Sequence, residues 1–333
     1  MSDRQEESTS TPTQTQTRAA FGLFNIWKPT GLTSRFVVDK VGTALGTSRV
    51  GHAGTLDPLA TGVLVMCAGQ ASRLVPFIQQ QSKEYVAVFQ LGCTSDTDDV
   101  TGIVEENLAA VKPTREQILN LLPEFTGRIE QVPPDYSAVR VRGRRAHQLA
   151  RRGKNLKIPA RLVDVYRLEL VAYEYPRLEL LVECGSGTYV RSIGRDIGEK
   201  LGCGAVLSEL VRTRVGPFTK ENAILLENLS AKELERHTLP TRWATADLTQ
   251  HRCTPHEMCE LVQGRRFPWQ PAHAALPDRS QIALLDPNGE LAAVSEIRYE
   301  TGWIHPFLVF PDREETMQQY GPPPVNSVSE PES

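Results

Sequence analysis

The stretch GHAGTLDPLATGVLV, residues 51–65, joins a glycine-containing loop to a continuous apolar run. Asp57 is its single carboxylate, and Pro58 follows directly. Because proline pushes the preceding residue away from the helical region, we expect Asp57 in an extended or turn segment before a strand that starts near Val63. The stretch therefore predicts a loop with one acid that leads into a core strand.

Strand and helix patterns alternate on both sides of this loop. Patterns typical of strands cover residues 21–29, 62–69, 83–92 and 160–185. Helical spacing or helix caps, including a Thr114/Gln117 capping box, mark residues 33–46, 70–81, 113–127 and 189–202. The order is neither all-parallel nor all-β, so it predicts an α+β domain built on a largely antiparallel sheet.

The pattern changes after residue 247. A short helix at 254–264 precedes a hairpin signal at 286–289, and the strand pattern ends at 303–310. We expect a small, mostly-β second domain over 248–312. Residues 1–20 and 313–333 are too polar to bury enough surface to offset the entropy of ordering, so we expect disordered tails there.

Composition narrows the class of protein. A chain of 333 residues with 40% hydrophobic content can bury a sizeable core. No apolar run approaches the roughly 20 residues of a membrane helix, and the N-terminus does not resemble a signal peptide. We therefore expect a cytoplasmic protein, without membrane contact, whose six cysteines are reduced thiols.

One cysteine-containing segment could bind a metal. In CTPHEMC, Cys253, His256 and Cys259 offer three possible ligands, but no fourth ligand follows at a recognisable spacing. Ordinary buried thiols are the favoured interpretation, and no metal is expected.

Positive charge is concentrated in residues 136–160. The whole chain has a net charge of −3, whereas this run holds eight Lys or Arg and no acid. A solvated helix face is one interpretation, but there is no acid to form i,i+4 ion pairs. The run therefore favours contacts with nucleic-acid phosphates, with Arg144, Arg145, Arg151 and Arg152 as candidates.

Asp57 itself has two interpretations. An isolated Asp-Pro most often stabilises a turn through its side chain. Here Gly51, Gly54 and Gly62 allow a ligand or another segment to approach closely, and His52 adds a flat polar ring. These neighbours favour a pocket.

Five blocks of the sequence resemble the bacterial tRNA pseudouridine-55 synthases, the TruB family. They are WKPTGLTS (27–34), the stretch around Asp57 (51–64), KEY (83–85), PPDYSAVRVRG (133–143) and GTYVRSIGRDIG (187–198), and the resemblance covers roughly 21–310. It implies a catalytic domain over 21–247 with a basic thumb inserted at about 133–161, followed by a PUA-like RNA-binding domain over 248–312.

The resemblance also implies the reaction. These enzymes isomerise uridine-55 in the TΨC stem-loop of tRNA by detaching uracil at N1 and rejoining it through C5, without cofactor or metal. The target base must be flipped out of its stack. The resemblance gives Asp57 the role of nucleophile, and it leaves open whether the carboxylate attacks the ribose, attacks the base or assists glycal formation.

Further roles follow from the same resemblance. Arg191 is implied to keep Asp57 ionised, and Tyr85 to stack on the target base and to be a candidate for removing a ribose proton. His52 fills space near the flipped nucleotides. The remaining matched residues line the uracil pocket or support the site: Tyr189, Leu210 and Lys28.

Three other functions compete with this one. A non-catalytic tRNA-binding or folding module would not need Asp57, Tyr85 and Arg191 together. A glycosidase or nucleosidase would usually need a second catalytic carboxyl group, which the signature loop does not supply. A guide-RNA-directed relative acting on ribosomal RNA is disfavoured by the basic thumb and by the absence of long Lys-rich tails. No obligate protein partner is implied.

Overall fold

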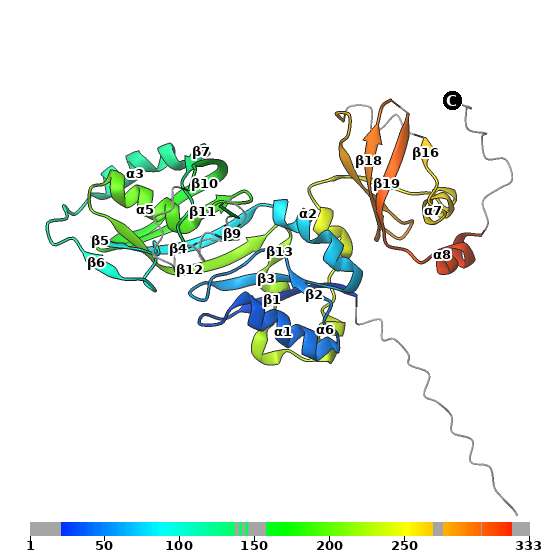
Figure 1. Cartoon of the computed structure of the whole chain (residues 1–333), viewed down its shortest axis with the longest axis horizontal. Helices are drawn as coiled ribbons and strands as arrows, with labels where there is room; N and C mark the ends of the chain where they lie inside the picture. Colours follow the sequence, from blue (N-terminus) through cyan, green and yellow to red (C-terminus); the bar gives the residue numbers. More distant parts are fainter. Residues whose placement is uncertain are drawn as a thin grey trace, which may run out of the picture.

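The structure is a computed structural model that describes residues 21–136, 140–141, 144–145, 158–268, 276–300 and 302–321. Figure 1 shows one long sheet running across the molecule and a second, smaller sheet at its upper right. The tail expected at 1–20, the residues from 322 onward and two candidate thumb residues, Arg151 and Arg152, lie outside the described residues.

The long sheet belongs to the N-terminal, larger part of the described chain. Its strands follow the order β14 (Ile224–Leu225), β1 (Gly22–Lys28), β3 (Thr61–Ala68), β12 (Ala205–Val215), β4 (Lys83–Leu91), β11 (Arg177–Cys184), β10 (Arg161–Glu174) and β7 (Gly127–Gln131). Two short strands, β2 (Val50–His52) and β13 (Phe218–Thr219), pair with β3 and β12. Only the β1–β14 and β12–β3 pairs are parallel among the described strands of this sheet. The predicted α+β fold with a largely antiparallel sheet is therefore confirmed.

Several helices of the described residues accompany this sheet. They are α1 (Ser34–Leu45), α2 (Val75–Gln80), α3 (Arg115–Leu121), α5 (Val190–Lys200) and α6 (Ala231–Arg236). Thr33 caps α1, and the Thr114/Gln117 capping box is present at α3. Two predicted helices are shorter than expected and are joined to 3₁₀ turns, Gly69–Leu74 before α2 and Leu122–Phe125 after α3. Prolines explain both junctions, since Pro76 and Pro123 fit only the first turn of a helical segment.

Two glycines let the elements around the site approach closely. A Cβ on Gly194 of α5 would lie 2.1 Å from the ring of Phe89 in β4. A Cβ on Gly62, whose φ is +113°, would lie 2.2 Å from the carbonyl oxygen of Arg212 in β12. Glycine is therefore required where α5 rests on the sheet and where β3 meets β12.

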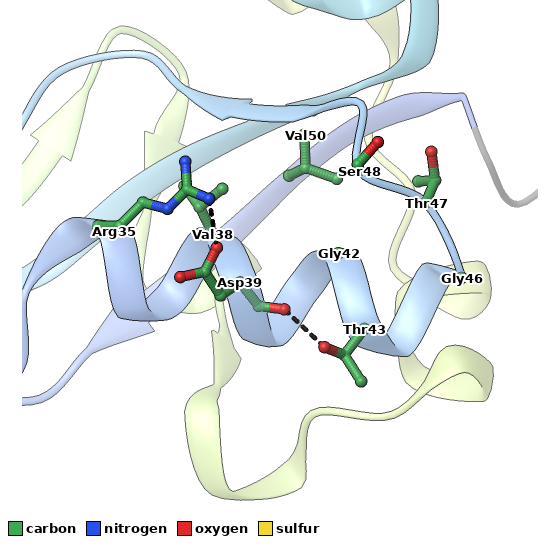
Figure 2. A pocket seen from close by; sticks show the side chains of 9 residues that line it. All are labelled: Arg35, Val38, Asp39, Gly42, Thr43, Gly46, Thr47, Ser48 and Val50. Carbon is green, nitrogen blue, oxygen red and sulfur yellow. Dashed lines mark hydrogen bonds and ion pairs between the residues drawn. The ribbon is translucent and has the colours of Figure 1, made fainter.

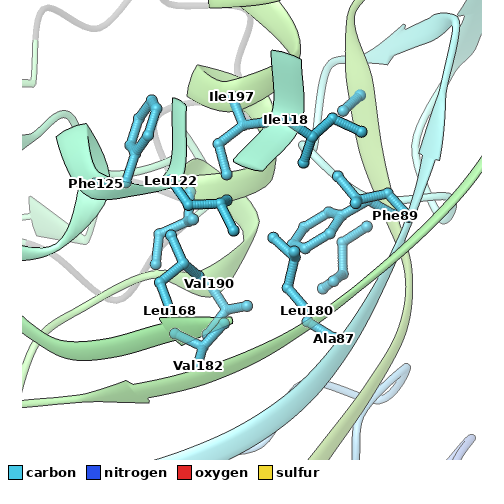
Figure 3. Packing of buried hydrophobic residues seen from close by; sticks show 14 of the residues in the cluster. Ala87, Phe89, Ile118, Leu122, Phe125, Leu168, Leu180, Val182, Val190 and Ile197 are labelled. Atoms are coloured by element: carbon cyan, nitrogen blue, oxygen red, sulfur yellow. The ribbon is translucent and has the colours of Figure 1, made fainter. Parts of the chain in front are cut away.

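The core beneath α5 is apolar. Figure 3 shows Phe89 and Ala87 of β4, Leu180 and Val182 of β11, and Val190 and Ile197 of α5 in one buried cluster. Half-buried Tyr85 and Leu210 pack against the same cluster. The cluster thus fixes α5 against the strands that carry two of the candidate site residues.

The smaller sheet belongs to the C-terminal part. Its order is β15 (Thr249–Arg252), β17 (Gln281–Leu285), β18 (Leu291–Arg298), β19 (Trp303–Val309) and β16 (Phe267–Pro268), and α7 (Pro255–Val262) accompanies it. Ala283, Leu285 and Val294 share a buried cluster with Leu23 and Val63 of the long sheet. The two sheets therefore share apolar packing, which limits their relative motion.

The structure corrects the expected C-terminal tail. Residues Arg313–Tyr320, expected to be disordered, form helix α8. Asp312 caps the helix by accepting from Glu314 N and Glu315 N. Thr316 is buried, and Tyr320 packs against the core of the smaller sheet. A few local contacts thus order a segment whose average composition is polar.

Two findings concern the expectations from composition. Among the described helices, none has the length and apolar character needed to cross a membrane. The six cysteines are buried and free, as expected for reduced thiols.

Candidate active site

Asp57 lies in the loop between β2 and β3, as its Pro58 neighbour predicts. Its backbone carbonyl accepts from Ala60 N at 3.0 Å, and the preceding Leu56 exchanges two 2.9 Å hydrogen bonds with the Ser34 hydroxyl at the start of α1. The loop is therefore held by backbone contacts. The Asp57 side chain stays 47% exposed, so a ligand can reach it.

Arg191 reaches this carboxylate from the first turn of α5. Its Nη2 lies 3.0 Å from Oδ2 of Asp57, and its side chain is only 9% exposed. A solvated surface arginine would not be buried in this way. The structure therefore brings Asp57 and Arg191 into direct contact from segments 134 residues apart (191 − 57).

A second carboxylate, Asp99, holds the other side of the guanidinium. Asp99 Oδ2 lies 3.3 Å from Arg191 Nη1, which also donates to the Thr97 carbonyl at 2.8 Å. Oδ1 of Asp99 accepts from Thr101 N at 2.9 Å and from the Thr97 hydroxyl at 2.8 Å. Arg191 thus lies between a fixed, buried carboxylate and an accessible one. Sequence reasoning missed Asp99; the run of Asp and Thr around it, TSDTDDVT at residues 94–101, is typical of a tight turn and is the local signal that marks this segment.

Tyr85 lies on β4 beside Arg212 of β12 in the strand register. Burial raises the pKa of Tyr85, and a hydrogen bond from the Arg212 guanidinium opposes this only in part. The phenol is therefore neutral at physiological pH. A neutral ring suits stacking on a base, whereas proton removal by Tyr85 would require its pKa to fall when substrate binds.

Arg212 is the second functional candidate that sequence reasoning missed. It is buried, and it donates to Val63 O at 2.7 Å and to Gly54 O at 3.1 Å. It therefore ties the Asp57 loop to the beginning of β3. The segment LVRTRVG contains two arginines, but only the strand register shows that Arg212 lies beside Tyr85.

Lys28 ends β1 next to the same loop. Its side chain is fully buried, and Nζ donates to Pro29 O at 2.9 Å and to Leu32 O at 2.7 Å. Burial lowers the pKa of Lys28 to about 8, against a smaller opposing effect of the Asp57 charge. Lys28 therefore fixes the backbone that follows β1 and adds positive charge near Asp57.

The other predicted pocket residues lie on or next to the elements that carry Arg191, Arg212 and the Asp57 loop. His52 is half-buried at the end of β2, where burial and then the charge of Arg212 lower its pKa, so its ring is neutral. Tyr189 precedes α5, and the guanidinium of Arg161 lies over its ring at 5.0 Å. Leu210 on β12 packs in the same cluster as Tyr85.

The basic run is only partly described. Arg144 and Arg145 form the short strand β9 (Arg144–Arg145), which pairs with β8 (Arg140–Val141). The side chains of both residues lie outside the described part of the chain. Their contact with RNA therefore stays a prediction from composition.

The cysteine-containing segment has its own structural role. Cys259 donates to Gly321 O at 2.7 Å, so its thiol links α7 to the end of α8. His251, Cys253 and Glu257 do have possible ligand atoms within 4.8 Å of one another. However, Glu257 pairs with His251 at 3.3 Å and accepts from Thr254 N, and burial raises the pKa of Cys253 to about 12. Glu257 is therefore explained as part of the cap of α7, and Cys253 as a buried thiol of the core.

A surface cavity of about 410 Å³ lies elsewhere, along α1 (Figure 2). Arg35 and Asp39 form a 2.8 Å ion pair at its edge, and Thr43 donates to Asp39 O. Asp57, Tyr85 and Arg191 are not among its lining residues. The candidate active site is therefore distinct from this cavity.

Comparison with known proteins defines the class. Residues 43–190 match the TruB family pseudouridylate synthase N-terminal domain, and residues 191–246 match the tRNA pseudouridylate synthase B C-terminal domain. The chain belongs to the TruB family of pseudouridine synthases, which are isomerases.

Individual relatives agree with this membership. The tRNA pseudouridine synthase B of Ruegeria pomeroyi is 41% identical over 294 residues, covering 87% of this chain and 95% of the relative. That of Acaryochloris marina is 44% identical over 251 residues, covering 74% and 85%. Among solved structures, a Cbf5-Nop10-Gar1 complex matches with a TM-score of 0.70 and 26% identity, covering 90% of this chain and 87% of that chain.

Proposed function

We propose that this protein isomerises uridine-55 in the TΨC stem-loop of tRNA to pseudouridine, with Asp57 as the nucleophile and the target base flipped out of its stack. One observation carries the proposal. The only carboxylate of the 51–65 stretch is accessible and lies 3.0 Å from a buried arginine, within a chain of the TruB family.

The chemistry needs few groups. The N1–C1′ bond breaks and a C5–C1′ bond forms, while the proton at C5 leaves and N1 gains a proton. No redox change or group donor is required. An ionised carboxylate serves each of the three routes, because Asp57 is the nucleophile in attack on the ribose or on the base and assists the elimination in glycal formation.

The surroundings of Asp57 support this role. Arg191 pairs with the Asp57 anion, and Asp99 and the Thr97 carbonyl hold the other side of its guanidinium in place. Tyr85 presents a neutral ring near the carboxylate, which suits stacking on a flipped uracil. The roles of His52, Tyr189 and Leu210 in lining the uracil pocket, and of Lys28 in supporting the site, are part of the proposal.

Recognition of RNA is assigned to two parts of the chain. The basic run at 136–160 is proposed to contact the stem-loop backbone through its arginines. The five-stranded sheet of the C-terminal part is proposed to be the PUA-like domain that holds tRNA at a greater distance from the site. The proposed location is the cytoplasm, where tRNA is available.

The test is to map pseudouridine in RNA from cells that lack the protein. We expect tRNA position 55 to become unmodified, and to recover with the wild-type chain but not with Asp57→Asn. Loss of pseudouridine from ribosomal RNA, with position 55 intact, would support the guide-directed alternative. Recovery of position 55 by Asp57→Asn would indicate a non-catalytic function.

A further inference from the structure

Tyr189, the residue that precedes α5, is held by two residues at the base of the inserted segment. Gln131 is the last residue of β7 and Arg161 is the first residue of β10. They are direct partners in the antiparallel register, and the chain between them carries the basic run. Gln131 and Arg161, at the two ends of the inserted segment, therefore both contact Tyr189 next to α5.

Gln131 fixes the backbone of Tyr189. Gln131 is only 1% exposed; its Oε1 accepts from Tyr189 N at 2.8 Å, and its Nε2 donates to Tyr189 O at 3.0 Å. Tyr189 is the N-cap of α5, and its own side chain makes no capping hydrogen bond. Its carbonyl also accepts the first helical bond, from Ile193 N at 3.2 Å. Gln131 therefore holds both backbone polar groups of the N-cap residue itself, at a helix start that has no capping side chain of its own.

Arg161 fixes the ring of Tyr189. Its guanidinium carbon lies 5.0 Å from the ring centre, which is within the range of a cation–π contact. Its Nη2 donates to Gly187 O at 2.8 Å, two residues before Tyr189 in the chain. Tyr189 and Gly187 both belong to the turn before α5. By contacting both of them, Arg161 restricts the ring and the turn together.

The position of Tyr189 matters for the ion pair of the site. Arg191 is two residues further on, in the first turn of α5, and its Nη2 must meet Asp57 Oδ2 at 3.0 Å. The same Nη2 donates to Tyr136 O at 3.2 Å, at the start of the basic run. A shift at the beginning of α5 would therefore move Arg191 away from Asp57.

We propose that Gln131 and Arg161 are positioning residues for the pseudouridine synthase reaction. Through Tyr189 they fix the start of α5 and so keep Arg191 aligned with Asp57. This inference rests on the proposed role of Asp57. Gln131 and Arg161 do not touch the reacting atoms; they act on the reaction only through Tyr189 and α5.

The first test is Gln131→Met, which keeps the length of the side chain and removes both hydrogen bonds. Three quantities are measured with a TΨC stem-loop RNA: the single-turnover rate at saturating RNA, the dissociation constant, and amide hydrogen exchange across residues 187–193. We expect the rate to fall about 10- to 100-fold, because small misplacements of a catalytic group are costly. The dissociation constant should change less than about 2-fold, and faster exchange should be confined to 187–193.

Gln131→Glu provides a graded variant. The introduced carboxylate can still accept from Tyr189 N but can no longer donate to Tyr189 O, and burial raises the pKa of such a group. Protonation at lower pH restores a donor. We therefore expect the ratio of variant to wild-type rate to rise as the pH falls from about 8 to about 6. If Gln131 only stabilised the fold, the recovery with falling pH would appear in the free energy of unfolding and not in the single-turnover rate of the folded variant.

Arg161→Met has a matched control in Arg167→Met. Both arginines lie on β10, but Arg167 pairs with Glu84 at 2.8 Å on the sheet and makes no described contact with Tyr189. We expect Arg161→Met to lower the single-turnover rate about 10-fold and Arg167→Met to leave it unchanged. Equal effects of the two substitutions would overturn the proposal.

The remaining outcomes are also decisive. An unchanged rate in Gln131→Met, despite faster exchange at 187–193, would show that the alignment of Tyr189 is irrelevant to catalysis. A loss confined to RNA affinity would make Gln131 and Arg161 part of RNA binding, and faster exchange throughout the sheet would make them structural. Failure of the proposed function itself is seen separately, as activity retained by Asp57→Asn.

Discussion

Arg191 Nη2 lies 3.0 Å from Asp57 Oδ2. Arg191 belongs to helix α5 and Asp57 to the loop before β3, and several strands of the long sheet lie between these two segments in the sequence. The guanidinium is buried while the carboxylate is half exposed. This arrangement stabilises the anion from the protein side and leaves its other side for a ligand. This geometry suits the proposed role of Asp57 as the nucleophile, and it determines what the first two substitutions should do.

Asp57→Asn should abolish product formation while leaving the fold and RNA binding nearly intact. The amide keeps the size of the side chain but is not a nucleophile. The measurement is nucleoside analysis of a TΨC stem-loop after incubation, together with a binding titration. Asp39→Asn, the same change at an exposed aspartate of α1, is the matched control and should remain fully active. Turnover by Asp57→Asn above the contaminating background would reject the assignment.

Arg191→Met should lower the rate far more than the affinity. Methionine fills much of the same volume but cannot pair with Asp57 or Asp99, so the transition state loses electrostatic support. We expect at least about a 100-fold loss in single-turnover rate with RNA affinity within about 3-fold. If the loss lay entirely in affinity, Arg191 would be a phosphate ligand instead. Circular dichroism of the variant provides the folding control, since Asp99 becomes a buried, unpaired charge.

The sequence indicated part of this site and not the rest. Asp57, Tyr85 and Arg191 lie in distinctive sequence blocks, and the Pro58 neighbour placed Asp57 in a loop before a strand. Asp99 and Arg212 were missed, because their roles depend on contacts across segments more than 90 residues apart (191 − 99 and 212 − 63). No local spacing relates Arg212 to the carbonyl of Val63.

The fold shows the same division. Caps predicted α1 and α3, helical spacing of apolar residues predicted α5, and alternation predicted the strand β4, because these signals are local. Helix α8 was assigned to a disordered tail, because its order depends on tertiary contacts: Thr316 is buried, half-buried Tyr320 packs against the core of the smaller sheet, and α8 contacts α7. Average polarity cannot report such tertiary contacts.

Lys28 should make the free energy of unfolding depend on pH in the alkaline range. Burial lowers its pKa from 10.5 to about 8, so between these values the unfolded chain holds a proton that the folded chain has released. The free energy of unfolding therefore rises as the pH increases from about 8 to 10.5. Below about pH 8 the folded chain also holds the proton, so the full cost of burying the charged Lys28 amine is present. We expect the difference in unfolding free energy between wild type and Lys28→Met to rise by up to about 3 kcal/mol from pH 8 to pH 10.5.

Denaturant titrations across that pH range measure this difference. Lys83, whose pKa is also lowered to about 8, is present in both proteins and cancels. Lys40→Met, at an exposed lysine of α1, serves as the control and should give a flat difference. A flat difference for Lys28→Met as well would show that the charged amine is not buried at a cost.

The basic run at 136–160 should contribute to RNA affinity but not to the rate of the chemical step. If Arg144, Arg145, Arg151 and Arg152 contact phosphates, changing all four to Gln should weaken RNA binding and lower the magnitude of the negative slope of log affinity against log salt. The reduction should reach up to about 0.9 per lost duplex contact. The rate on saturating RNA should change much less, because backbone contacts stabilise the bound ground state and the transition state alike. Filter binding from low to moderate salt measures the slope, and an unchanged slope would mean that the run is only a solvated surface.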